Sequence, residues 1–141
     1  MSVMTRLASL TLNLGSLKEL PCLEPFTELQ YLSLELPPDL TRLPSSIGKL
    51  AGLRELTLAC CGGITKLPSI ERLTSLETLL IIRCGALREL PASVDALTAL
   101  RTLQLVSLPN LTTLPVSIGA LTVFTGLTLN YCGLADVPSS I

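Results

Sequence analysis

Residues 76–97 read LETLLIIRCGALRELPASVDAL, and this stretch contains every feature of a pattern that recurs along the chain. It opens with the phrase L-x-x-L-x-L, completed here by an isoleucine. The phrase, with aromatic or isoleucine exchanges, begins at six places: Leu7, Leu29, Leu53, Leu76, Leu100 and Phe124. Self-similarity with spacings of 22 to 24 residues indicates a repeat architecture. We therefore expect residues 1–141 to form a single domain of about six units.

Each unit predicts a strand, a turn and one helical turn. Alternation in L-x-L is the period of a strand, in which every second side chain points to the same face. A proline follows a leucine in most units, as in Leu90-Pro91, and turns the chain because it lacks an N–H and fixes φ. The serine of the next phrase, S-[IV]-x-x-L, predicts a helical start whose amides the hydroxyl caps. Units one and three lack one residue after the proline, a deletion that a loop tolerates.

One unit cannot fold alone, because its apolar side chains have only the neighbouring units to pack against. The sequence therefore predicts an α/β solenoid shaped as a horseshoe. A parallel β-sheet would line its concave face, and short helical or irregular turns would form its convex face. The composition agrees with this prediction, since 48% of residues are apolar, 35 are leucine and only 15% are charged.

The pattern Leu76-x-x-Leu79-x-Ile81-x-x-Cys84-x-x-Leu87-x-x-Leu90-Pro91 resembles a known family. It is similar to the leucine-rich repeats of plant intracellular resistance receptors and of effectors from plant-pathogenic bacteria. The resemblance covers nearly the whole chain and implies the horseshoe fold, whose members serve many recognition tasks.

The resemblance also implies a buried Asn or Cys at the ninth place of each unit, in contact with the loop backbone. The residues that match are Cys61, Cys84 and Cys132. The residues that depart from it are Gly15, Pro37 and Leu108, so we expect looser turns in units one, two and five.

The variable side chains of the strands form the candidate partner-binding site. A parallel sheet normally has both faces covered, but the concave face of a horseshoe stays open. Aligning the six units gives columns of such side chains. The residues that we expect a protein partner to contact are Tyr31, Glu35, Arg54, Glu55, Glu77, Leu80, Ile82, Arg83, Arg101, Gln104, Val106 and Tyr131.

Two groups within this set have alternative interpretations. Arg54, Glu77 and Arg101 alternate in sign in successive units. They either form an ion ladder worth about 0–1 kcal/mol per exposed pair, or present charge to a partner. The apolar residues Leu80, Ile82 and Val106 either mark a contact site or are strong β-formers that their neighbours shield.

The five cysteines indicate reduced thiols, because their number is odd and no C-x-x-C pair occurs. Cys61 and Cys84 hold equivalent places in adjacent units. Without histidine or C-x₂₋₄-C spacing they do not predict a zinc site, and we expect no metal or other cofactor. Cys60 lies one place nearer the open face and is the predicted reactive thiol.

Charge and composition argue against several classes of function. A net charge of −1 provides no field to attract nucleic acid or anionic lipid. The apolar runs stop after four residues, as in Leu79 to Ile82, and are too short to span a membrane. Without histidine there is no Ser-His or Cys-His pair, and no phosphate-binding glycine loop occurs. We therefore do not expect an enzyme.

These observations favour a protein–protein interaction module. The effector resemblance implies an alternative, the substrate-recognition part of a larger enzyme such as a ubiquitin ligase effector whose catalytic domain is absent. Neither end carries a polar capping unit, which indicates a piece of a longer protein or end-to-end contact with another copy. The thiols and the lack of a visible secretion signal favour the cytoplasm, or a host cytosol for an effector-like protein.

Overall fold

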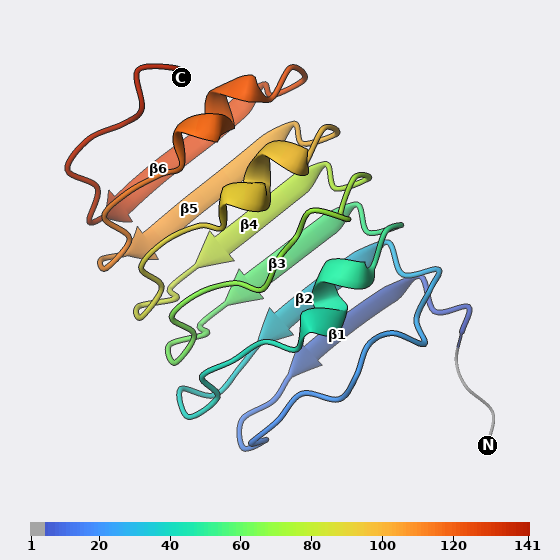
Figure 1. Cartoon of the computed structure of the whole chain (residues 1–141). Coiled ribbons are helices and arrows are strands. Elements are labelled where there is room, and N and C mark those ends of the chain that lie inside the picture. The colour runs from blue at the N-terminus through green and yellow to red at the C-terminus, as the bar shows by residue number, and fades with distance from the viewer. Residues whose placement is uncertain (1–4) are drawn as a thin grey trace.

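The computed structural model describes residues 5–141 and contains one sheet of six parallel strands in sequence order (Figure 1). Each strand begins two residues after the first apolar residue of its repeat phrase. The strands are β1 (Ser9–Asn13), β2 (Tyr31–Glu35), β3 (Glu55–Ala59), β4 (Thr78–Ile82), β5 (Thr102–Leu108) and β6 (Gly126–Cys132). Because each strand pairs with the next one along the chain, every unit forms one coil of a solenoid. The predicted architecture is confirmed.

The strands pair without a slip of register, so equivalent residues of the six units lie side by side. Leu56 and Leu103 are only 2% and 0% exposed, whereas Thr57, next to Leu56 in β3, is half-buried. The leucines therefore point to the shared interior, as the L-x-L period predicts. Burial is deepest in the middle units, and the equivalent residues of β1 and β6, such as Leu10 and Leu127, are only partly buried.

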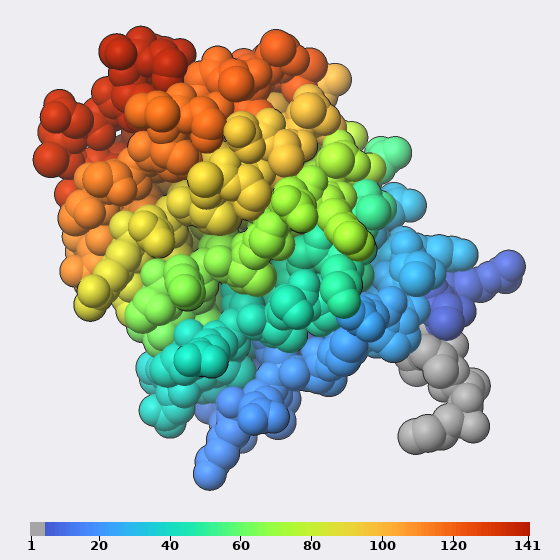
Figure 2. All heavy atoms as spheres, viewed as in Figure 1, coloured from blue at the N-terminus to red at the C-terminus, as the bar shows by residue number. Residues whose placement is uncertain are grey.

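Short 3₁₀ helices lie over the sheet on its convex side in units two, four and five (Figure 1). They are η1 (Ser45–Lys49), η2 (Ala92–Ala96) and η3 (Val116–Ala120). Each follows an extended proline, and in η1 the Ile47 N–H donates to the Pro44 carbonyl at 3.1 Å. Figure 2 shows the units stacked as successive bands on this side. None of the helices in residues 5–141 has the length and apolar character needed to cross a membrane.

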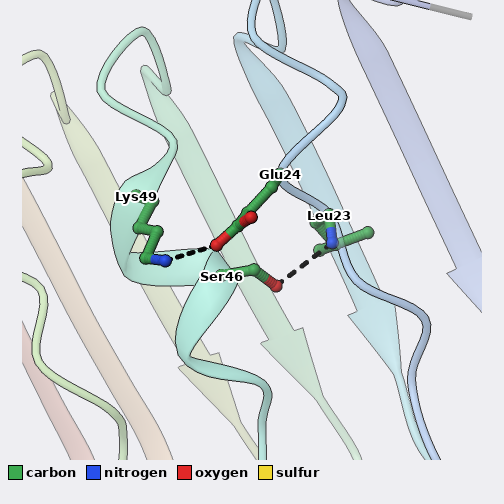
Figure 3. A network of polar contacts seen from close by, with 4 residues as sticks. All are labelled: Leu23, Glu24, Ser46 and Lys49. Carbon is green, nitrogen blue, oxygen red and sulfur yellow. Dashed lines mark hydrogen bonds and ion pairs between the residues drawn. The ribbon is translucent and has the colours of Figure 1, made fainter.

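Units one and three, which lack a residue after the proline, form no 3₁₀ helix in the described part of the chain. Their inward-facing residues find another hydrogen-bond partner. The Leu23 N–H donates to the Ser46 hydroxyl of unit two at 3.1 Å (Figure 3), and the Ile70 N–H donates to the Ser93 hydroxyl of unit four at 3.2 Å. The missing residue is thus compensated from the next unit along the chain.

The expectation that these serines cap their own helices is wrong. A proline occupies the N-cap position of all three 3₁₀ helices, and none of the caps has a side-chain hydrogen bond. The hydroxyls instead join neighbouring units. Beside Ser46, Lys49 and Glu24 form an ion pair that also links units one and two (Figure 3).

A left-handed residue occurs near the end of four strands. Cys60, Arg83, Ser107 and Tyr131 occupy the same place in units three to six, with φ between 54° and 57°. Unit five therefore keeps the turn of its neighbours, and the expectation of a looser turn there is wrong. Leu108 is fully buried and fills with its own bulk the space that cysteine takes in the other units.

Units one and two turn differently, as expected from Gly15 and Pro37. Their equivalent residues, Leu14 and Leu36, do not have a positive φ. Pro37 explains unit two, because a residue that precedes proline is restricted to extended conformations. Leu36 is only 3% exposed and belongs to the core, not to the open face.

Candidate functional site

Three rows of side chains cover the open face of the sheet, and each row crosses all six strands in register. The first row is Ser9, Tyr31, Glu55, Thr78, Thr102 and Gly126. The second is Thr11, Ser33, Thr57, Leu80, Gln104 and Thr128. The third is Asn13, Glu35, Ala59, Ile82, Val106 and Asn130. The columns read from the sequence are confirmed, although the third lies within the strands and not beyond them.

The structure brings the sequence-predicted residues to one face and its two edges. On the face lie Tyr31, Glu35, Glu55, Leu80, Ile82, Gln104 and Val106. Arg54, Glu77 and Arg101 immediately precede their strands. They therefore line the side of the sheet formed by the N-terminal ends of the strands, which we call the entry edge. Arg83 and Tyr131 lie at the opposite edge, with left-handed backbones.

At the entry edge, the ion ladder is reduced to one pair. An Arg54 nitrogen lies 3.9 Å from a Glu77 carboxylate oxygen, and about half of each side chain is exposed. Arg101 has no ion pair within residues 5–141. An exposed pair at this distance contributes little to stability.

The entry edge also contains a hollow of about 660 Å³ that sequence reasoning missed. Among the residues that line it are Glu28, Gln30, Arg54, Ser75 and Glu77. Glu28 and Ser75 stand one place before the first leucine of their units. Aligning that place across the units as one more column would have found them.

The half of the face over β1 to β3 is polar and acidic. Tyr31 is 41% exposed and is the register partner of Glu55 on β3. Glu35 accepts a hydrogen bond from the Asn13 amide at 3.2 Å. Within the described residues, neither Glu35 nor Glu55 has an ion-pair partner. This half of the face therefore presents two unneutralised carboxylates.

The half of the face over β4 and β5 carries the predicted apolar patch. Ile82 and Val106 are register partners, and Leu80 lies two residues before Ile82 on β4. All three are half-buried. The patch therefore exists, with part of each side chain shielded by its neighbours and part open to a partner.

The opposite edge combines an exposed aromatic residue with thiols of different accessibility. Tyr131 is 85% exposed and Cys60 is half-buried, whereas Cys61 and Cys84 are buried. The Cys61 thiol donates to the Ala59 carbonyl at 3.4 Å, and the Cys84 thiol donates to the Ile82 carbonyl at 3.5 Å.

The two buried thiols also affect each other's ionisation. The neighbouring Cys84 thiol and burial raise the pKa of the Cys61 thiol above its ordinary value. The neighbouring Cys61 thiol lowers the pKa of the Cys84 thiol. In residues 5–141 no three His, Cys, Asp or Glu side chains are grouped so as to hold a metal ion. These cysteines contact backbone, as the family resemblance implies for the ninth place.

Among the solved structures that resemble this chain are two leucine-rich repeat proteins. One is the leucine-rich repeat domain of the type III effector XopL, with 31% identity and a TM-score of 0.79 over 92% of this chain. The other is a leucine-rich repeat protein of Leptospira interrogans, with 28% identity and a TM-score of 0.71 over 93% of this chain. This chain spans 46% and 39% of those two chains. No protein-family model matches the sequence, and neither does any curated protein.

Proposed function

Because this chain folds as a leucine-rich-repeat solenoid, we propose that it is an interaction module that binds a protein partner through its concave face and the two flanking edges. The observation that carries the proposal is the set of three rows that cross six strands in register. With strands about 4.8 Å apart, these rows extend over roughly 24 Å. A surface of this width suits another protein better than a small molecule.

The chemistry of the rows supports the same proposal. Exposed Tyr and Arg side chains, which are enriched among the residues that dominate binding energies, lie at Tyr31, Tyr131 and Arg83. The patch of Leu80, Ile82 and Val106 supplies apolar area on the same face. Charged residues at the entry edge would surround the contact with a polar rim.

Affinity capture tests the proposal with three forms of the protein. What we call the face variant reverses the three charges at the entry edge that flanks the face, as Arg54→Glu, Glu77→Lys and Arg101→Glu. A matched control carries the same change of net charge on exposed residues of the turns, as Arg42→Glu, Arg72→Glu and Glu89→Lys. We expect the intact chain and the turn variant to retain the same partner and the face variant to lose it. Equal capture by all three forms would contradict binding at this site.

A further variant separates the two interpretations of the apolar patch. Leu80→Thr combined with Ile82→Lys removes apolar area from the face without touching the buried leucines. Loss of the partner with unchanged free energy of unfolding would assign the patch to binding. Retained binding with lower stability would assign it to packing.

The similarity to a type III effector domain favours one second candidate, the substrate-recognition part of a larger enzyme. The chain would then select the protein on which a catalytic domain acts, and the same face would carry the contact. The reading frame that flanks the chain tests this candidate, which requires a catalytic domain there. For either candidate we propose a reducing compartment such as the cytoplasm or a host cytosol, because buried Cys61 and Cys84 donate hydrogen bonds as thiols.

A further inference from the structure

A small hollow lies in the open face over β1, β2 and β3, among the first three residues of these strands. Its volume is about 50 Å³, close to that of one or two water molecules. Its rim consists of Tyr31, Glu55 and the hydroxyl residues Ser9, Thr11, Ser33 and Thr57, and its floor of Leu10 and Leu32. We call it the face hollow. It belongs to the proposed binding surface but was not predicted as a separate feature.

The polar groups at the rim suit a cation. Glu55 is exposed and has no ion-pair partner among the described residues, so its negative charge is unneutralised. The Tyr31 ring lies on the adjacent strand in register with Glu55, and an aromatic face attracts a cation electrostatically. The surrounding hydroxyl oxygens can accept hydrogen bonds. No positively charged side chain lines the face hollow.

The size of the face hollow selects the kind of cation. A lysine ammonium is a compact charge with three donors, comparable in size to a water molecule, and can use a carboxylate and two hydroxyls together. The wide planar guanidinium of arginine needs more room. A free metal ion would require several carboxylates, and only Glu55 is present here.

The apolar patch lies about two strands further along the sheet, over β4 and β5. Two strand spacings correspond to about 10 Å. A peptide in the polyproline II conformation, with three residues per turn and a rise of about 3.1 Å per residue, crosses this distance in about three residues. Residues three positions apart in this conformation point to the same side, so such a segment would place an apolar side chain on the patch when the lysine three positions away lies in the face hollow.

We propose that the face hollow binds a lysine side chain of a segment of the protein partner in the polyproline II conformation, with an apolar residue three positions from that lysine on Leu80, Ile82 and Val106. The inference rests on the proposed function and specifies the chemistry of its partner. Charge complementarity with Glu55 and the cation–π contact with Tyr31 give the segment its preferred position.

Nuclear magnetic resonance titration with a defined peptide tests this proposal. The probe is the capped hexapeptide acetyl-SKSSLS-amide, and its control replaces the lysine with norleucine, which keeps the aliphatic stem and removes the charge. We expect saturable shifts at Tyr31 and Glu55 and at the methyl groups of Leu80, Ile82 and Val106. The norleucine peptide should bind about fivefold more weakly.

Protein variants locate the effect. Glu55→Gln should lower the affinity for the lysine peptide about fivefold, so that the variant binds the lysine and norleucine peptides equally. Glu71→Gln is the matched control, because it removes an exposed carboxylate of a turn outside the open face, and should change the affinity by less than about twofold. Tyr31→Phe keeps the ring and should bind as the intact chain does, whereas Tyr31→Leu should bind more weakly.

Four outcomes would overturn the inference. Equal binding of both peptides, equal effects of Glu55→Gln and Glu71→Gln, or equally tight binding of lysine amide alone would each remove the assigned segment. Peptide shifts confined to the apolar patch would do so while leaving the interaction function intact. That function itself falls only if the face variant described above captures the same partner as the intact chain.

Discussion

Cys60 and Cys61 are adjacent in sequence, yet their side chains have different surroundings. Cys60 has a left-handed backbone at the edge of the open face and is half-buried. Cys61 is buried, and its thiol donates to the Ala59 carbonyl of its own unit at 3.4 Å and lies 3.8 Å from the Leu34 carbonyl of the preceding unit. One position along the chain thus separates a solvent-accessible thiol from one that the repeat uses as a small apolar donor.

Native thiol labelling should reflect this difference. We expect iodoacetamide at pH 8 to modify exposed Cys22 and half-buried Cys60 roughly tenfold or more faster than Cys61. The thiolate is the reactive form, and a raised pKa together with burial keeps Cys61 protonated and inaccessible. Mass spectrometry of peptides, sampled over time, measures each rate. Denatured protein, in which all the rates should converge, is the control.

Equal labelling rates at Cys60 and Cys61 in the native protein would mean that the strand register assigned to unit three is wrong by one residue. Such a slip would move every side chain of the strand to the other face. The labelling experiment therefore also tests the assignment of Glu55 and Thr57 to the open face.

At the scale of the repeat element, the two short units show how a deletion is absorbed. A full unit closes its turn within itself, as where the Val94 N–H donates to the Pro91 carbonyl. A short unit has no such bond for Leu23 or Ile70, and a serine of the next unit accepts it. An unpaired buried N–H would lower the stability of the fold. The serine hydroxyl replaces the missing carbonyl acceptor, so the short units stack on their neighbours without this cost.

Ser46→Ala should therefore lower the free energy of unfolding by about 1–2 kcal/mol, because it leaves the buried Leu23 N–H without an acceptor. Ser117→Ala is the matched control. Its hydroxyl donates at 3.4 Å to an exposed carbonyl, that of Ala92, which water can satisfy. We expect the control to change stability by less than about 0.5 kcal/mol in urea unfolding. Similar losses for both variants would contradict the bridging role of Ser46.

The sequence predicts the strands and the apolar interior well, because the L-x-L period and the repeat spacing indicate the same strand position and the same inward-facing residues in every unit. It predicts the turns less well. The S-[IV] phrase resembles a helix cap, but Pro44 already occupies the cap position and Ser46 lies within reach of the neighbouring unit. Contacts between units depend on how the coils stack, which local patterns do not encode.

The dependence on stacking also explains which parts of the candidate site the sequence predicts. Register placed Tyr31 beside Glu55 and Ile82 beside Val106 once the repeat was aligned. The face hollow and the entry-edge hollow depend on side-chain shape across several units, so no single unit reveals them. The Arg54–Glu77 pair forms, whereas Arg101 stays outside it, a difference that alternating sign alone could not show.

At the scale of the whole molecule, stability is shared between neighbouring coils and not held by any one of them. A residue in a middle strand packs against coils on both sides, whereas its equivalent in β1 has a neighbouring coil on one side among the described residues. Burial follows this arrangement, since Leu79 is 1% exposed and Leu10 is only partly buried. In such arrays the stability is approximately a sum of unit and nearest-neighbour terms.

The equivalent substitution in two units tests this arrangement. Leu79→Ala should cost about 2–5 kcal/mol, the usual range for a buried leucine flanked on both sides. Leu10→Ala should cost about half as much or less, because part of its surface already contacts water and fewer neighbours lose packing. Urea unfolding followed by circular dichroism gives both values. Equal costs would mean that the units are stabilised separately, and the leucines would then not point into one shared core.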